Sequence, residues 1–300
     1  MYYKSDGVEY TPPAVNSDCL GHFVTWSTRR IGRLLRTTLA DKLVDAGLDP
    51  SFAKELSRDC AFTRGCKMLS ENRVIDRLDG VQTDTVTFQF TKKQLEGGQF
   101  AHWHEALIHL DKITGAITCP DKPGLGEMAQ RRFDKALIER NTSDVTRLIQ
   151  RMFAKNADMM PIIKEEGRSY FVPAEHTEFL LKVRTFVRSI GGRFVALPIG
   201  GGGDDADYTT EEVSETVADY ITGMIGELAV TVDNWDAKTR LSTFTRKNDE
   251  YQSIRFKMRA YSTYLKGNLA KVEHCLDAAQ KQMASKIGEV QAASRELQAC

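Results

Sequence analysis

The sequence lacks an excess of charge of either sign. Its 300 residues contain 41 Lys and Arg and 41 Asp and Glu, so the formal net charge is zero. A neutral chain has no bulk attraction to nucleic acid or to anionic lipid, and any such binding has to come from a local cluster of charge. Charged residues make up 27% and apolar residues 41%, which excludes a chain that is disordered as a whole.

Long apolar runs and paired cysteines are missing too. The longest uncharged apolar run, residues 194–199, is far too short to cross a bilayer, so we expect no membrane partner. The first six residues lack the basic and apolar regions of a secretory signal peptide, and we expect none. The six cysteines include no C-x-x-C pair, and a chain of this length has enough core without disulfides. The sequence therefore predicts reduced thiols and a cytoplasmic location.

Recognisable catalytic motifs are absent as well. The sequence contains no G-x-S-x-G nucleophile elbow, and no phosphate-binding glycine motif follows a predicted strand. The glycine run at 200–203 is followed by Asp204, Asp205 and Asp207, and acidic residues would repel a phosphate. We therefore interpret residues 200–208 as a flexible linker. No cofactor is predicted, and the protein is expected to have no enzymatic activity unless scattered residues build an active site.

Proline and glycine are unevenly distributed, and this places the main predicted boundary. All eight prolines and 18 of the 22 glycines lie at or before residue 203. The predicted fold class is α+β, with a mixed N-terminal domain followed by a long helical coiled-coil or hairpin domain. The predicted ranges are 1–199 for the first domain, with a sub-boundary near 120–142, then 200–208 for the linker and 209–300 for the helical domain.

The N-terminal domain is expected to combine helices with antiparallel strands. The apolar spacing predicts helices at about 26–46, 51–69, 125–140, 143–156 and 174–190. Period-two alternation predicts a three-stranded meander from 85–90, 100–111 and 116–119, a hairpin of 160–164 with 170–172, and a last strand at 193–199. Gly191 and Gly192 suit the end of the last of these helices. The first 18 residues are rich in turn formers.

The C-terminal domain carries the strongest periodic signal. Thr209 and Glu212 match a capping box, so we expect a helix to start there and to end at a turn at residues 233–234. From residue 241 to 297, mostly apolar residues recur at three- and four-residue steps without a proline, which is the pattern of a coiled-coil seam. As one continuous helix this segment would extend roughly 85 Å.

A seam of that length exceeds what the other helix of the domain can cover, so we favour self-association along it, with an intramolecular bundle as the alternative. The predicted function is that of a non-enzymatic, self-associating scaffold. Its oligomer would present the N-terminal domains to another protein subunit or to nucleic acid. The predicted self-association residues are Leu265, Leu269, Val272, Leu276, Met283, Ile287 and Val290.

DNA binding is the second hypothesis, because several predicted helices carry basic stripes. A helix, a second helix and a hairpin follow one another over residues 125–172, which is the order of a winged helix-turn-helix. The candidate contacts on the second helix are Arg147, Gln150, Arg151 and Lys155, and those on the helix at 26–46 are Arg29, Arg33 and Arg36. Glu165 and Glu166 at the expected wing tip argue against this interpretation, since phosphate would repel them.

A third basic tract lies in the C-terminal domain. Between Lys238 and Lys271 nine bases stand against two acids, and aromatic residues are interleaved with them. Such a mixture suits single-stranded nucleic acid, which binds by stacking and by charge. Residues 204–219, however, contain seven acids and no base, and they would face this tract in a folded-back hairpin. Internal charge pairing is therefore the favoured interpretation.

Three of the six histidines lie within eight residues, which raises the question of a metal site. Strand alternation places His102 and His104 on one face with Ala106, and it places Glu105 and His109 on the other. Two ligands on a face are too few for a closed metal site. We interpret these residues as half-buried strand histidines, and a metal-dependent enzyme using His102 and His104 is the weakest of the three hypotheses.

Overall fold

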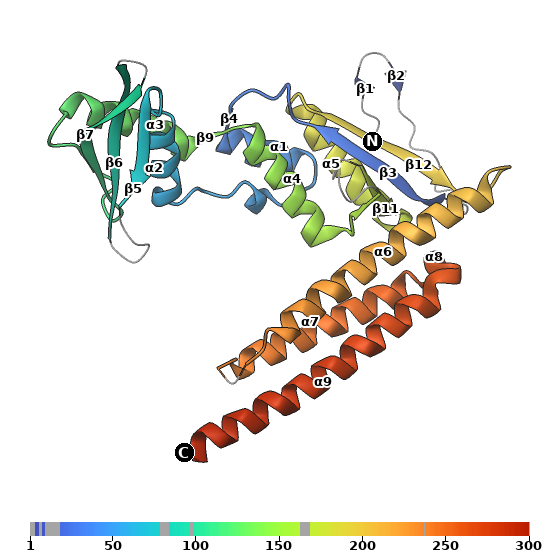
Figure 1. Ribbon diagram of the computed structural model, residues 1–300. Helices are drawn as coiled ribbons and strands as arrows, with labels where there is room; N and C mark the ends of the chain where they lie inside the picture. Colours follow the sequence, from blue (N-terminus) through green and yellow to red (C-terminus); the bar gives the residue numbers. More distant parts are fainter. Residues whose placement is uncertain are drawn as a thin grey trace. The chain divides into compact units, whose positions relative to one another are not determined.

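The computed structural model describes residues 4–5, 8–9, 19–78, 84–96, 99–162, 169–236 and 238–299. The fold is mixed α+β with a C-terminal helical region, which confirms the coarse form of the predicted fold class (Figure 1). Most of the turn-rich first 18 residues lie outside the described ranges, which include two short paired strands there, β1 (Lys4–Ser5) and β2 (Val8–Glu9). Within the described residues, no helix has both the length and the apolar character that a membrane crossing requires.

The chain divides into two compact units whose ranges interleave. One unit contains residues 1–26, 156–181 and 194–300, and the other contains residues 27–155 and 182–193. This division differs from the predicted one at residues 200–208. The strand that ends at Gly200 belongs to the same sheet as residues 19–27, so the segment before the glycine run groups with the C-terminal helices.

The first unit contains a four-stranded sheet in the order β10, β11, β3 and β12. The strands are β3 (Cys19–Ser27), β10 (Met160–Pro161), β11 (Tyr170–Pro173) and β12 (Arg193–Gly200). Antiparallel pairing of β10 with β11 confirms the predicted hairpin, whose turn with Glu165 and Glu166 lies outside the described residues. Phe171 of β11 packs edge-on against Tyr264, which joins the sheet to the helical region of the same unit.

The C-terminal helices of this unit lie side by side (Figure 1). They are α6 (Ala206–Asp233), α7 (Leu241–Ala260), the short α8 (Ser262–Leu265), the 3₁₀ turn η3 (Lys266–Asn268) and α9 (Leu269–Ala299). The segment predicted as a seam is therefore not one helix, because it breaks after α7 and α9 packs back on α6 and α7. Ser214 of α6 holds the break by donating to the carbonyl of Leu265 at 2.6 Å and accepting from Asn268 at 3.0 Å.

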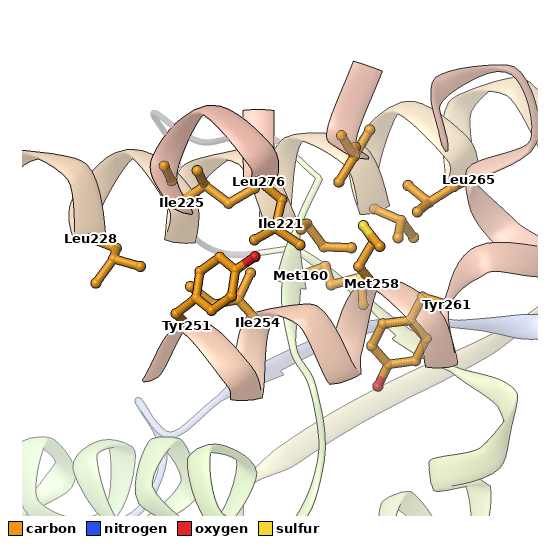
Figure 2. Close-up of a cluster of buried hydrophobic side chains, with 14 of the residues drawn as sticks. Met160, Ile221, Ile225, Leu228, Tyr251, Ile254, Met258, Tyr261, Leu265 and Leu276 are labelled. Carbon is orange, nitrogen blue, oxygen red and sulfur yellow. The ribbon is translucent and has the colours of Figure 1, made fainter. Parts of the chain in front are cut away.

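This break places the apolar seam inside a single chain. Figure 2 shows Tyr251, Ile254 and Met258 of α7 beside Ile221 and Ile225 of α6, and all five are buried. Five of the predicted self-association residues are buried in the same core, and two are partly buried against it; the seven are Leu265, Val272, Leu276, Met283 and Val290, with Leu269 and Ile287. The prediction of self-association assumes a seam that is too long to be covered within one chain. The structure covers it within one chain, so this reason no longer holds.

The boundaries of α6 correct one prediction and confirm another. The helix begins at Ala206, so Thr209 and Glu212 lie inside it instead of forming a capping box at its start. The start follows Gly203, which has a positive φ of 103° and accepts a hydrogen bond from the Ala206 amide at 3.2 Å. The helix ends at Asp233, as the sequence predicted.

The second unit contains the predicted meander, extended by one strand to the order β5, β6, β7 and β8. The strands are β5 (Arg73–Arg77), β6 (Thr85–Glu96), β7 (Gln99–Asp111) and β8 (Ile117–Thr118). Helices α2 (Arg58–Lys67) and α3 (Pro123–Ile138) share a core with this sheet through Phe62, Phe88 and Phe133. Gly65 lets the two helices approach, because a Cβ there would lie 3.0 Å from the backbone nitrogen of Phe133.

The main difference from the predicted secondary structure lies at residues 26–46. The predicted helix at 26–46 is a strand, a turn and a shorter helix, α1 (Arg36–Asp45). Residues 34–35 form β4, which pairs with β9 (Glu139–Arg140), and this pairing keeps them out of the helix. The helix predicted at 51–69 is the 3₁₀ turn η1 (Pro50–Phe52) followed by α2. Helix α4 (Thr142–Asn156) matches the prediction, as does the glycine end of α5 (Thr177–Ser189), where Gly191 has a φ of 82°.

Strain at Lys266 gives a first testable expectation. This residue has φ 38° and ψ −115°, a conformation that is costly for any residue with a Cβ. We expect Lys266→Gly to raise the free energy of unfolding by about 1 kcal/mol, as the relieved strain exceeds the added entropy of the unfolded chain. Urea unfolding measures the change. The matched control, Lys281→Gly at an exposed position inside α9, should lose about 1 kcal/mol, and a loss at both positions would contradict the assignment of strain.

Candidate functional site

The three clustered histidines lie on one face of the meander, contrary to the alternation argument. The pairing of β6 with β7 shifts by one residue at Glu105, so His104 pairs with Thr91 and His102 pairs with Lys93. His109 pairs with Thr87 on the same face, because directly paired residues point to the same side of a sheet. The predicted placement of His102 and His104 with Ala106 is therefore wrong, since a β-bulge resets the alternation.

The shared face does not bring the histidines to one point. His102 and His104 are exposed, and the Nε2 atom of His104 lies 3.9 Å from the Oδ2 atom of Asp121. Among the described residues, no three His, Cys, Asp or Glu side chains converge as a metal site requires. His109 instead shares a 2.9 Å hydrogen bond with the Thr87 hydroxyl.

The bulge residue Glu105 is a structural anchor. Its carboxylate accepts two hydrogen bonds from Arg73, at 2.6 and 3.1 Å, and one from Lys122 at 3.0 Å. Its side chain is 6% exposed. The Arg73 hydrogen bonds, with help from Lys122, lower the pKa of Glu105 to about 2 in spite of its burial. This geometry ties β5 and the start of α3 to the bulge in β7.

The predicted recognition helix leaves all four of its candidate residues exposed, but two of them make contacts within the unit. Arg147 and Gln150 of α4 are exposed. Arg151 donates to the carbonyl of Phe52 at 3.2 Å, and Lys155 pairs with Asp49 at 3.3 Å and lies over the Phe52 ring. These contacts connect the C-terminal half of α4 to the turn at residues 49–52. Helix α3, the expected partner of α4 in a winged helix, packs against α2 and β8.

A different segment joins the N-terminal half of α4. The hydroxyls of Thr28 and Thr146 share a 2.9 Å hydrogen bond, and the Thr142 hydroxyl donates to the carbonyl of Ile31 at 3.1 Å. These contacts bring the turn at 28–31 against α4. Arg29 and Arg30 of that turn are exposed, as is Arg147, which follows Thr146. We name Arg29, Arg30 and Arg147 the arginine cluster.

The acids around this region already have basic partners. The ion pairs are Arg33 with Glu139 at 3.4 Å, Arg36 with Glu55 at 3.2 Å and Arg64 with Asp144 at 2.7 Å. Two predicted nucleic-acid contacts, Arg33 and Arg36, are therefore at least partly neutralised. The three members of the arginine cluster have no ion pair among the described residues, so their positive charge is not compensated.

The start of α4 is held by a second set of polar contacts. Asn141 accepts from the Asp144 amide at 3.0 Å, and Asp144 accepts from the Asn141 amide at 2.9 Å. Burial would raise the pKa of Asp144, but the hydrogen bonds from Arg64 and from the Asn141 amide outweigh it and lower the pKa. The buried Arg140 donates to the carbonyls of Leu137 and Lys54. These contacts give α4 and the arginine cluster a rigid support.

The first unit contains a polar cluster that the sequence analysis missed. We name it the Asp158 cluster, and its members are Asp158, His176, Tyr220, Lys257 and Tyr261. Asp158 accepts from Tyr261 at 2.5 Å, from Tyr220 at 3.0 Å and from Lys257. The Nε2 atom of His176 lies 3.4 Å from the Tyr261 hydroxyl and accepts from the Asp158 amide. The cluster thus links α6 and α7 to the segment before β10.

The electrostatics of the Asp158 cluster are those of an anchor. Burial would raise the pKa of Asp158, but hydrogen bonds from Lys257 and Tyr261, with the charge of Lys257, outweigh it and lower the pKa. Burial and the bond to Asp158 raise the pKa of Tyr261, which stays a neutral donor. Both carboxylate oxygens of Asp158 carry donors from the helices. The residues come from three distant parts of the chain, and no sequence motif identifies them as a cluster.

Comparison with known proteins identifies the family of this chain. A family model described as a family of unknown function, DUF6744, matches residues 19–297. The chain belongs to the DUF6744 family. No curated protein and no solved structure matches it. The family match covers both compact units of this DUF6744 chain, so the arginine cluster and the Asp158 cluster both lie within the matched residues.

The Glu105 anchor predicts a pH dependence of stability. Because its folded pKa of about 2 lies below the ordinary value of 4.5, its contribution is present above pH 4.5 and is lost as the pH falls toward 2. Glu105→Gln should therefore lower the free energy of unfolding at pH 7 by about 2 kcal/mol and remove this acid-dependent part. Urea unfolding at pH 7 and pH 3 measures both effects. The control is Glu127→Gln, an exposed acid 3.9 Å from Arg131, which should behave as the wild type.

The Asp158 cluster predicts a larger effect at neutral pH. Asp158→Asn removes the counter-ion of the half-buried Lys257, and the free energy of unfolding should fall by about 3 kcal/mol. Urea unfolding followed by circular dichroism checks this. Asp277→Asn, an exposed acid on α9, is the matched control and should change stability by less than about 0.5 kcal/mol. Equal stability of the two variants would exclude an anchoring role.

Proposed function

We propose that this protein binds nucleic acid without an enzymatic activity of its own, and that the arginine cluster is its phosphate-binding surface. The observation that supports this proposal is the uncompensated charge of Arg29, Arg30 and Arg147. The chain is neutral, and the neighbouring acids are paired with other bases. The Thr28–Thr146 hydrogen bond joins the two segments that carry these three exposed arginines, which favours a local concentration of positive charge.

Arginine suits this role for a geometric reason. Its planar guanidinium donates two parallel hydrogen bonds to phosphate oxygens, and it stays charged at every physiological pH. The cluster sits on a turn and a helix that hydrogen bonds hold together, so little backbone entropy has to be lost on binding. Gln150 lies one helical turn after Arg147 and is also exposed, which adds a polar contact beside the cluster.

The proposal of phosphate contact claims less than the predicted winged helix did, because it does not include recognition of base edges in the major groove. A recognition helix needs its exposed side chains free to reach base edges in the major groove. In α4 the contacts of Arg151 and Lys155 with the 49–52 turn take up part of that face. We therefore propose binding that depends on charge more than on base sequence.

Self-association as a scaffold is the second candidate. Its original support was the length of the apolar seam, and that seam is covered within one chain. What remains exposed on α6 includes single apolar side chains such as Val230, 64% exposed, which is weak support for a protein partner. Light scattering on the full chain, at low and high salt, distinguishes a monomer from the predicted coiled-coil oligomer, and we expect a monomer.

Nucleic-acid binding by the arginine cluster is tested by fluorescence anisotropy with labelled single-stranded and duplex oligonucleotides. The variant is Arg29→Ala/Arg30→Ala/Arg147→Ala in the full chain. We expect its affinity for both ligands to fall at least tenfold at about 50 mM salt. The slope of log affinity against log salt should decrease by about 2 to 3, because three phosphate contacts are lost.

The control for this experiment removes the same charge elsewhere in the unit. Lys67, Arg131 and Arg132 are exposed bases on α2 and α3, and their triple alanine variant has the same net charge as the test variant. Equal loss of affinity in both variants would mean that net charge alone drives the binding. Absence of binding by the wild type at about 50 mM salt would refute the proposed function.

A further inference from the structure

The second basic surface of the molecule lies on α7 of the other unit, around Phe256. This side chain is 73% exposed, although its neighbours Ile254 and Met258 are buried in the helical core. Figure 2 shows Tyr251, Ile254 and Met258 on the core side of the helix. Phe256 lies two residues from both Ile254 and Met258, about 200° around the helix axis, and so faces away from the core.

The residues that share the exposed face of Phe256 are polar or basic. Gln252 precedes it by four residues and Arg259 follows it by three, so both lie beside it on the helix surface, and both are exposed. Arg255 is adjacent and half-buried. The acid nearest along this face is Asp249, two turns away. We name Gln252, Arg255, Phe256 and Arg259 the Phe256 surface.

The arginines of this surface are not neutralised by the acidic stretch of α6. The sequence suggested that residues 204–219 would pair with the basic tract of α7. Among the described residues, the ion pairs of α7 are Lys257 with Asp158 and Lys247 with Glu250. Arg255 and Arg259 have no ion pair in the described part of the chain. Internal pairing therefore leaves the charge beside Phe256 free for a ligand.

We propose that the Phe256 surface binds single-stranded nucleic acid, with the ring stacking on a base and the two arginines contacting the flanking phosphates. An aromatic ring between cations matches a strand whose unpaired bases and charged backbone are both accessible. A duplex offers the phosphates but keeps the faces of its bases inside the stack. A lipid surface would need a broad apolar helix face, and one phenylalanine does not supply it.

This inference rests on the proposed function and adds a ligand class to it. Its experiment uses the full chain, a labelled strand of about 30 thymidines and a duplex of the same length. Phe256→Ala should weaken binding of the single strand about tenfold and change duplex affinity less than about twofold. Phe256→Trp should restore binding, since any aromatic ring can stack. Arg255→Ala/Arg259→Ala should reduce the salt slope for the single strand by about 1 to 1.5.

The controls separate failure of this inference from failure of the proposed function. Val230→Ala removes another exposed apolar side chain from the same unit and should bind as the wild type does. If the arginine-cluster variant loses binding while Phe256→Ala binds both ligands like the wild type, the Phe256 surface is not a contact and the proposed function stands. Equal loss for single strand and duplex would exclude stacking. A lower mass by light scattering in Phe256→Ala than in the wild type would make this surface a contact between copies and overturn the inference.

Discussion

The structure of the C-terminal half depends on one constraint, which is that the apolar residues between 241 and 297 have to be covered. A straight helix would leave this seam exposed and would require a second chain. The break at residues 261–268 removes that requirement, because it lets α9 return along α6 and α7. Ser214 supplies hydrogen bonds at the point where the helical ladder is interrupted, so the turn does not leave the buried carbonyl of Leu265 without a donor. The apolar residues of the seam are thereby covered within one copy of the chain. Any partner has to bind to the residues that remain exposed on the surface.

The elements that could be predicted from sequence are those with local signals. Alternation located the meander, and Gly191 marked a helix end. The helix expected at 26–46 failed because Leu34 and Leu35 pair with the distant strand β9, and two other errors arise where one residue changes the backbone geometry. The bulge at Glu105 moves His102 and His104 to the opposite face, and the positive φ of Lys266 ends a helix without proline or an obligatory glycine. Of the candidate site, Arg29 and Arg147 were named as basic residues, but the approach of their two segments depends on the Thr28–Thr146 contact, which no sequence pattern encodes.

The neutrality of the chain conceals an uneven local balance. Acids that could neutralise the arginine cluster are held by other partners, such as Asp144 by Arg64 and Glu139 by Arg33. Each of these pairs also connects two segments, so the acids are committed to the fold. A charge that is fixed in a partly buried pair attracts distant ligands weakly, since its partner cancels its field. The unpaired arginines therefore add uncompensated positive charge at the arginine cluster, although they are a small fraction of the 41 basic residues.

The Asp158 cluster helps to fix the orientation of α7. Lys257 and Phe256 are adjacent in the chain, and their side chains leave the helix about 100° apart. Lys257 is directed to Asp158, while Tyr251, Ile254, Met258 and Tyr261 face the core, so the rotation of α7 about its axis is fixed by an ion pair and by packing together. Because the rotation of α7 is fixed, the Phe256 side chain cannot point into the core of the helical region. Its exposure, and that of Arg259 one turn later, is therefore a consequence of the same contacts that stabilise the unit. A ligand binding at this face would meet the ring and the guanidinium groups on a helix whose orientation is already fixed, with no helix rotation required to present them.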